Sequence, residues 1–227
     1  MRDMSAGPSV KGLIEASFLD WPGKVAAVVF LPGCNWRCPF CHNRELVLTP
    51  GNIGDIPLAE ALSRLERAWV DGVCVTGGEP TINPRLADML REIRAAGFPV
   101  RLDTNGSDPG VLKELIASGL IASAAMDIKA PLDPASYRAA TGVDADVDAV
   151  RESIRLLLGS GLPVTFRMTV VPGLHDANAV RSAAGEIGGN ALVLQNFRPA
   201  DTLDSSYERI KPFTPEEFRA LKDAAKV

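Results

Sequence analysis

Six short apolar segments alternate with amphipathic segments along most of the chain, and this alternation restricts the fold more than any other feature. Most of the apolar segments are near-continuous runs, as strands are when helices cover a parallel sheet. They span residues 25–31, 72–76, 100–104, 122–128, 164–171 and 191–197. Parallel strands need crossover connections, and these are right-handed. The pattern therefore predicts an α/β fold, a partial (β/α)6 barrel with parallel strands.

The segments between these strands carry apolar residues at helical spacing. Such stripes lie within 58–65, 86–93, 112–116 and 150–158, with a weaker pattern over 176–187. Glycines stand just past the ends of three predicted helices, at positions 97, 119 and 161. Thr214-Pro215-Glu216-Glu217 is a capping box with proline at the first helical position, so a last helix is expected to run to about Lys226.

The chain has 227 residues without a linker, repeat or low-complexity tract, which predicts one domain over 1–227. Residues 1–24 would form an N-terminal extension, with 12–23 at the sheet edge, and 199–227 a C-terminal tail and helix. A net charge of −4 offers no footprint for nucleic acid. The longest apolar run, 25–31, is too short to span a bilayer, and no signal peptide is recognisable. We therefore expect a cytoplasmic protein with neither nucleic acid nor membrane as a partner.

Polar and glycine residues follow the predicted strands where a barrel of this kind places its chemistry, at the carboxyl ends. Cys34 follows the first strand and Gly77-Gly78-Glu79 the second. Asp103-Thr104-Asn105 ends the third strand, and Asp127 and Lys129 end the fourth. Asp127 and Lys129 alternate with apolar residues, so we expect both charged side chains to point into the barrel mouth.

Three of the four cysteines share one short segment with the spacing C-x3-C-x2-C, at positions 34, 38 and 41. In a reducing cytosol this grouping indicates a metal or redox site rather than a disulfide framework. Soft sulfur ligands favour zinc, copper(I) or an iron–sulfur cluster. A structural zinc ion would need a fourth ligand. His42 is poorly placed for this, His175 is distant in sequence, and Cys74 lies in an apolar strand.

Three thiolates suffice for a [4Fe–4S] cluster with one open iron, which could bind a substrate or cofactor. A thioredoxin-like redox motif at Cys38-Pro39-Phe40-Cys41 is an alternative, but it leaves Cys34 unexplained. We expect Cys74 to be an ordinary buried cysteine, because free cysteine is among the most buried residue types.

The cysteine motif, with aromatic Phe40 before its third cysteine, resembles that of the radical S-adenosylmethionine (SAM) superfamily. Gly77-Gly78-Glu79-Pro80 is similar to the glycine-rich motif that binds the methionine end of SAM in that family. The resemblance implies a partial (β/α)6 barrel with a [4Fe–4S] cluster on Cys34, Cys38 and Cys41. It also implies that SAM chelates the open iron and is cleaved reductively to a 5′-deoxyadenosyl radical.

Further segments resemble glycyl-radical-enzyme activases, and among these the activating protein of anaerobic ribonucleoside-triphosphate reductase. They are 12–24, Cys41-His42-Asn43, 103–106, 126–129 and 167–173. This resemblance implies hydrogen abstraction from a glycine of a partner enzyme, with flavodoxin or ferredoxin as electron donor. Activases often carry a second, ferredoxin-like cluster insert. The extra cysteines are absent here, so one cluster is expected.

The predicted contacts to SAM come partly from this resemblance and partly from position at the strand ends. They are Phe40, Gly77, Gly78, Glu79, Asn105, Lys129, Arg167 and Arg198. The resemblance to activases also implies a monovalent cation near Asp103, Thr104 and Asp127. Two residues have a structural alternative: Glu79 could cap the turn that follows it, and Arg167 could form an internal salt bridge with Asp127.

Two other functions remain open at this point. One is a radical SAM enzyme that acts on a small molecule, of the 7-deazaguanine-synthase type. The other is a non-enzymatic iron–sulfur carrier, which would need no SAM site. We favour a protein substrate, because the 30 residues after the sixth strand leave little chain for a lid over a small molecule.

Overall fold

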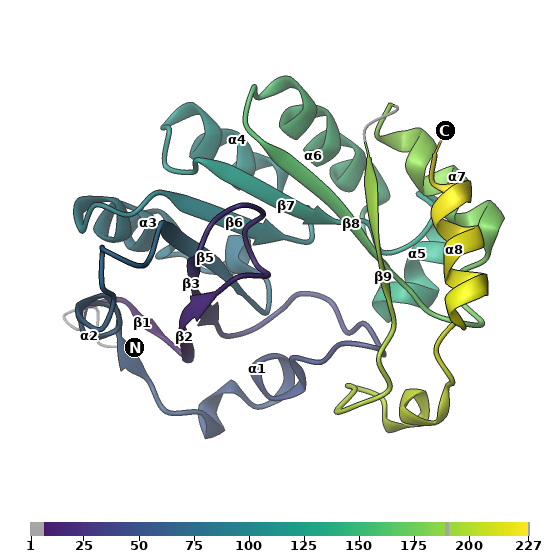
Figure 1. Ribbon diagram of the computed structural model, residues 1–227, viewed down its shortest axis with the longest axis horizontal. Coiled ribbons are helices and arrows are strands. Elements are labelled where there is room, and N and C mark those ends of the chain that lie inside the picture. The colour runs from purple at the N-terminus through teal and green to yellow at the C-terminus, as the bar shows by residue number, and fades with distance from the viewer. Residues whose placement is uncertain (1–6, 189–190, 227) are drawn as a thin grey trace.

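A computed structural model describes residues 7–188 and 191–226 of the chain. Its main sheet has seven strands in the order β2-β3-β5-β6-β7-β8-β9 (Figure 1). All neighbouring strands from β3 to β9 are parallel, and β2 pairs antiparallel with β3 at one edge. The strands are β2 (Gly12–Ser17), β3 (Ala26–Leu31), β5 (Gly72–Gly77), β6 (Val100–Thr104), β7 (Ser123–Asp127), β8 (Val164–Val170) and β9 (Leu192–Asn196).

The six predicted strands are thus the six parallel strands, with ends shifted by at most a few residues. The edge extension predicted over 12–23 contains β2, and its pairing with β3 is interrupted by a bulge between Ile14 and Ser17. A second, two-stranded sheet of β1 (Ser9–Val10) and β4 (Ile56–Pro57) had no signal in the sequence pattern. Residues 1–6 of the predicted extension lie outside the described residues.

The predicted helices all form, although α2 ends before Leu65 and α8 ends at Ala224. The helices are α1 (Arg44–Leu48), α2 (Leu58–Ser63), α3 (Leu86–Ala95), α4 (Pro109–Ala117), α5 (Pro134–Thr141), α6 (Val147–Gly159), α7 (Ala177–Glu186) and α8 (Pro215–Ala224). The 3-10 turns are η1 (Pro50–Asn52), η2 (Pro80–Ile82) and η3 (Ser205–Arg209). The Thr214 capping box is present, and the glycines at positions 97, 119 and 161 have the positive φ that ends a helix.

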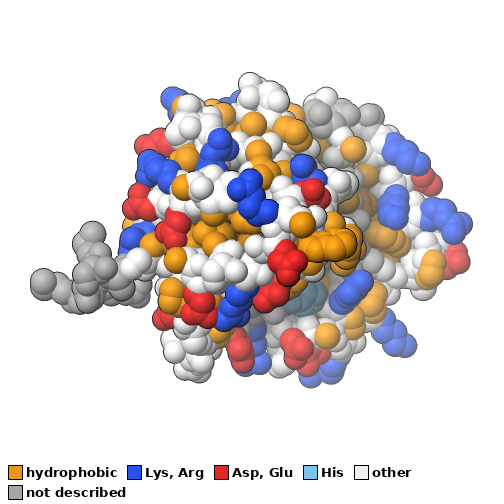
Figure 2. All heavy atoms as spheres, turned by 60° about the vertical axis from the view of Figure 1, so that its left-hand side comes forward, with side chains coloured by type: hydrophobic (Ala, Val, Ile, Leu, Met, Phe, Trp, Pro, Cys, Tyr) orange, Lys and Arg blue, Asp and Glu red, His pale blue; other side chains and the backbone are white. Residues whose placement is uncertain are grey.

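Two clusters of buried apolar side chains lie between the sheet and the helices. One joins β3, β5 and β6 to α2, α3 and α4, and the other joins β7, β8 and β9 to α5, α6 and α7. Figure 1 shows α3, α4 and α6 along one side of the curved sheet. On the face of the molecule shown in Figure 2, acidic and basic side chains are interspersed. No helix among the described residues is long and apolar enough to cross a membrane.

The opposite, inner side of the sheet carries the polar residues. Met126 and Ile128 are fully buried in the helix-facing core, so Asp127 and Lys129, which alternate with them, point inward, as the sequence pattern predicts. A small inner cluster of Trp21, Val28 and Cys74 with their apolar neighbours fills part of the barrel. The inner face is therefore apolar in one part and charged in another.

Candidate functional site

A cavity of about 420 Å³ lies at the carboxyl ends of the strands. Most of the residues predicted from the sequence line it: Cys34, Cys38, Phe40, Cys41, Gly77, Gly78, Glu79, Asp103, Thr104, Asn105, Asp127, Lys129 and Arg167. Thr76, Thr169 and Gln195 also line it and had no signal in the sequence, while Asp20 reaches it from the turn between β2 and β3. Segments far apart in the chain thus meet in one place.

The cysteine loop, residues 33–43, forms one wall of the cavity. Cys38 is buried, whereas Cys34 and Cys41 are half-buried. Burial raises the pKa of the Cys38 thiol to about 12 and also raises that of Cys34; Lys129 opposes both shifts. The free thiols of Cys34 and Cys38 are therefore protonated near neutral pH, and metal binding would have to displace their protons.

The donor set of this loop fits an iron–sulfur cluster, because it presents three soft ligands on one wall of one cavity. In the described part of the chain, no three His, Cys, Asp or Glu side chains are already arranged to hold a single metal ion. Cys74 is fully buried on β5, packed with Trp21 and Val28 and outside the cavity wall. It is an ordinary buried cysteine, as its apolar strand predicts.

The glycine pair at the end of β5, Gly77 and Gly78, packs against the end of β3 and the cysteine loop. The N–H groups of Gly78 and Glu79 donate to the carbonyl oxygens of Leu31 and Gly33, at 2.9 and 2.8 Å. A Cβ on Gly78 would collide with the Gly33 carbonyl, and one on Gly77 would collide with the Leu31 backbone. Glycine is needed here for close approach to the loop.

Glu79 joins the ends of β5 and β6 and is 1% exposed. Its carboxylate accepts hydrogen bonds from the backbone N–H and hydroxyl of Thr81, from the Thr104 hydroxyl and from the Asn105 N–H, at 2.6–3.0 Å. Burial raises the pKa of Glu79, while these bonds oppose the shift. Glu79 thus caps the turn that follows it, which is the structural role predicted for it. Glu79 also lines the cavity, so its contact with SAM stays a prediction.

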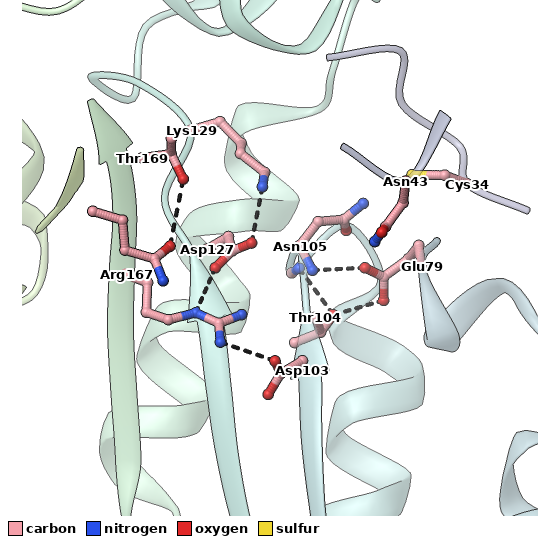
Figure 3. A network of polar contacts seen from close by, with 12 residues as sticks. Cys34, Asn43, Glu79, Asp103, Thr104, Asn105, Asp127, Lys129, Arg167 and Thr169 are labelled. Atoms are coloured by element: carbon pink, nitrogen blue, oxygen red, sulfur yellow. Dashed lines mark hydrogen bonds and ion pairs between the residues drawn. The ribbon is translucent and has the colours of Figure 1, made fainter. Parts of the chain in front are cut away.

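A network of charged side chains crosses the cavity floor (Figure 3). Arg167 Nε donates to Asp127 Oδ1 at 2.8 Å, and a terminal guanidinium nitrogen donates to Asp103 Oδ2 at 2.9 Å. Lys129 Nζ donates to Asp127 Oδ2 at 2.9 Å. Burial alone would raise the pKa of Asp127, but Arg167 and Lys129 hold it well below its usual range. The salt bridge weighed for Arg167 therefore exists, and it reaches two carboxylates.

His175 and Tyr137 hold the backbone of Lys129 from both sides. His175 Nδ1 accepts from the Val171 N–H at 2.9 Å, so its proton is on Nε2, which donates to the Lys129 carbonyl at 2.9 Å. The Tyr137 hydroxyl accepts from the Lys129 N–H at 3.3 Å. Burial lowers the pKa of His175 to about 4. Phe40 packs edge-on against this neutral ring.

Asn105 ties β6 to the cysteine loop, because its amide donates to Asn35 Oδ1 at 3.0 Å. Thr104 faces Glu79 rather than its neighbour Asp103. Arg198 is exposed and lies outside the cavity lining; only its carbonyl reaches the loop, as acceptor for His42 Nε2 at 2.8 Å. Among the predicted site residues, the structure separates Arg198 from the rest.

Fold and site together define an α/β-barrel enzyme with a thiol-bearing cofactor site at the mouth of its barrel. The chain belongs to the radical SAM superfamily, whose family model matches residues 28–183. The cofactors of that family are a [4Fe–4S] cluster and SAM, and the thiols and adjoining glycine turn fit both.

The relatives include two activating enzymes that match over most of their length. A protein of Methanocaldococcus jannaschii, provisionally named a glycyl-radical enzyme activating enzyme, is 30% identical over 223 residues, covering 96% of this chain and 91% of its own. The pyruvate formate-lyase-activating enzyme of Streptococcus mutans is 29% identical over 246 residues, covering 94% and 90%. A protein of Thermococcus kodakarensis that is named a probable GTP 3′,8-cyclase is 32% identical over 200 residues. The match covers 83% of this chain and 62% of the relative.

Among solved structures, Streptococcus suis SuiB bound to S-adenosylmethionine has a TM-score of 0.61 at 18% identity. The match covers 86% of this chain and 47% of SuiB. At this identity it shows a shared fold, which agrees with the partial barrel predicted from the sequence.

Proposed function

We propose that this protein is a radical SAM activase that generates a glycyl radical on a partner enzyme. Cys34, Cys38 and Cys41 would hold the [4Fe–4S] cluster. When bound, the cluster and SAM supply the one-electron cleavage of the sulfonium and the group that abstracts hydrogen. The observation that carries the proposal is the convergence of three thiols, a glycine turn and a cationic pair on one cavity. Two activating enzymes match along nearly their whole length, which supports it.

The residues of this chain would bind and orient SAM beside the loop. Arg167 and Lys129 are the cations of the cavity floor and suit the SAM carboxylate. Gly77, Gly78, Glu79 and Asn105 would line the side nearest the cysteine loop, and Phe40 would shield it. Arg198 remains a prediction, with the least support because its side chain is exposed outside the cavity.

The monovalent cation predicted near Asp103, Thr104 and Asp127 also remains a proposal. Both carboxylates already have a cationic partner in Arg167, so an added ion would have to share them. The test is to compare SAM cleavage in sodium, potassium and tetramethylammonium salts of equal ionic strength. Equal rates in all three would remove the cation from the account.

A macromolecular substrate is supported by the two activating enzymes that match along nearly their whole length. A partner could close the barrel mouth by laying a glycine-bearing loop across it. The finer proposals are that this partner is an anaerobic ribonucleoside-triphosphate reductase and that a cytoplasmic flavodoxin or ferredoxin supplies the electron.

A small-molecule reaction is the second candidate, favoured by the match with the GTP 3′,8-cyclase. The deciding experiment incubates the reconstituted, reduced protein and SAM with a candidate anaerobic reductase, or separately with GTP or a purine precursor. A glycyl doublet in the electron paramagnetic resonance (EPR) spectrum of the reductase supports the activase. Conversion of the nucleotide with no protein radical would replace it with the second candidate. No SAM cleavage in any mixture would favour the iron–sulfur carrier.

A further inference from the structure

Charged side chains form a continuous row through the inside of the barrel. In order toward the mouth they are Arg101, Asp103, Arg167, Asp127 and Lys129, and we refer to these five as the charge ladder. Each is within ion-pair distance of the next, at 3.4, 2.9, 2.8 and 2.9 Å. Figure 3 shows the four members from Asp103 to Lys129. The signs alternate along the whole row.

Arg101 is the member with no place in the site described above. It is 3% exposed and does not line the cavity. One of its terminal nitrogens donates to Ser123 Oγ at 3.0 Å, and Ser123 in turn donates to the Pro163 carbonyl. The guanidinium is therefore held in place from the side away from the mouth. A buried guanidinium is costly, which calls for a reason beyond filling space.

The contact between Arg101 and Asp103 acts through charge. Arg101 Nε and Asp103 Oδ1 are 3.4 Å apart, and neither atom has a hydrogen-bond partner in the described part of the chain. Asp103 is 6% exposed and lies between the guanidiniums of Arg101 and Arg167. Without Arg101, Arg167 would be the one guanidinium left beside Asp103 to balance its negative charge.

The charge of the ladder follows from its members. Three cations and two carboxylates leave a surplus of one positive charge, and the cations at the cavity are Arg167 and Lys129. Removing Arg101 would leave two cations and two carboxylates, with no surplus. We propose that Arg101 is a positioning residue that neutralises Asp103 and so leaves Arg167 and Lys129 one uncompensated positive charge for a ligand carboxylate. This inference rests on the proposed SAM site and names the group of SAM that the site would select.

The test compares two ligands that differ only in that carboxylate, SAM and decarboxylated SAM. Their dissociation constants are measured by equilibrium dialysis on the anaerobically reconstituted, oxidised protein and on Arg101→Met. We expect SAM to bind about tenfold more weakly to Arg101→Met, as one charge acting across the ladder would produce, and decarboxylated SAM to bind as before. Arg101→Lys should bind both ligands like the unaltered protein. An equal weakening of both ligands would mean that Arg101 only supports the fold, and would overturn the proposal.

A charge-compensated variant gives a second test. Arg101→Met combined with Asp103→Asn again leaves one surplus positive charge, so SAM affinity should return to within about threefold of the unaltered protein. If the SAM affinity of the double variant did not recover, the proposed role of the charge ladder would be contradicted. If Arg101→Met does not fold, the double variant can still be compared with the unaltered protein. Iron content and cluster absorbance are recorded for each variant. If the unaltered protein holds its cluster but binds neither ligand, the proposed function itself fails; if it binds both and Arg101→Met binds both equally well, only the ladder fails.

Discussion

His175 should make the stability of this protein fall as the pH falls below neutrality. Its ring is buried, accepts the Val171 N–H at Nδ1 and donates to the Lys129 carbonyl from Nε2. A second proton would have to go on Nδ1, where it would break the bond from Val171 and bury a charge. This is why burial lowers the pKa of His175 to about 4 from its usual 6.5.

The sign follows from which state binds the proton. Below about pH 6.5 the unfolded chain protonates His175 and the folded chain does not, so the stability gained from the neutral ring is complete above that pH and is lost as the pH falls toward 4. With these two pKa values, lowering the pH from 7 to 5 should reduce the free energy of unfolding by about 2 kcal/mol through this residue alone.

The assay is urea unfolding of the cluster-free protein with reduced thiols, at pH 7 and pH 5, so that loss of iron does not contribute. The unaltered protein is compared with His175→Gln, which cannot titrate here, and with His42→Gln as a matched control. His42 is an exposed residue and is the other histidine of the chain. His175→Gln should lack the loss of about 2 kcal/mol, and His42→Gln should retain it. Equal pH dependence in the unaltered protein and His175→Gln would refute the reasoning.

Three further predictions concern the site. Replacing any one of the three loop cysteines with Ala should abolish a cluster of about four irons, whereas Cys74→Ala should leave it nearly intact; loss of iron in Cys74→Ala would overturn the ligand assignment. Arg167→Lys should keep the cluster but weaken SAM binding about tenfold, because Lys lacks the planar fork with which Arg167 donates to Asp127 from Nε and to Asp103 from a terminal nitrogen; unchanged affinity by dialysis would restrict Arg167 to a structural role. Gly78→Ala should destabilise the protein by about 2 kcal/mol or more and lower iron content, since its methyl group meets the Gly33 carbonyl; unfolding curves and iron assays like those of the unaltered protein would show that the loop can move aside.

The strands and the inward direction of the charged residues could be predicted because both depend on local pattern. Short apolar segments, most of them near-continuous runs, predicted all six parallel strands, and the alternation around Asp127 placed it and Lys129 at the mouth. Helix α5 was missed because Pro134–Thr141 is short and has only a weak apolar stripe. Local pattern identifies the face on which a residue lies but not the group opposite it.

The pairing of polar groups was less predictable, because strand register and loop packing set it. Arg101 lies in a strand that the sequence predicts, but its place beneath Asp103 depends on the neighbouring strands. His175 was considered only as a distant metal ligand, yet it fixes the backbone of Lys129. The close packing of Gly78 on Gly33 likewise needs the three-dimensional arrangement of two loops.

The origin of the hydrogen that SAM's adenosyl group receives tests the central claim most directly. The reduced protein is incubated with SAM and a candidate anaerobic reductase whose glycines carry deuterium at Cα, and the 5′-deoxyadenosine is analysed by mass spectrometry. An activase predicts one deuterium in 5′-deoxyadenosine, matched by a glycyl radical on the reductase and absent when the target glycine is replaced by Ala. Deuterium-free 5′-deoxyadenosine, formed while the reductase remains without a radical, would contradict the account.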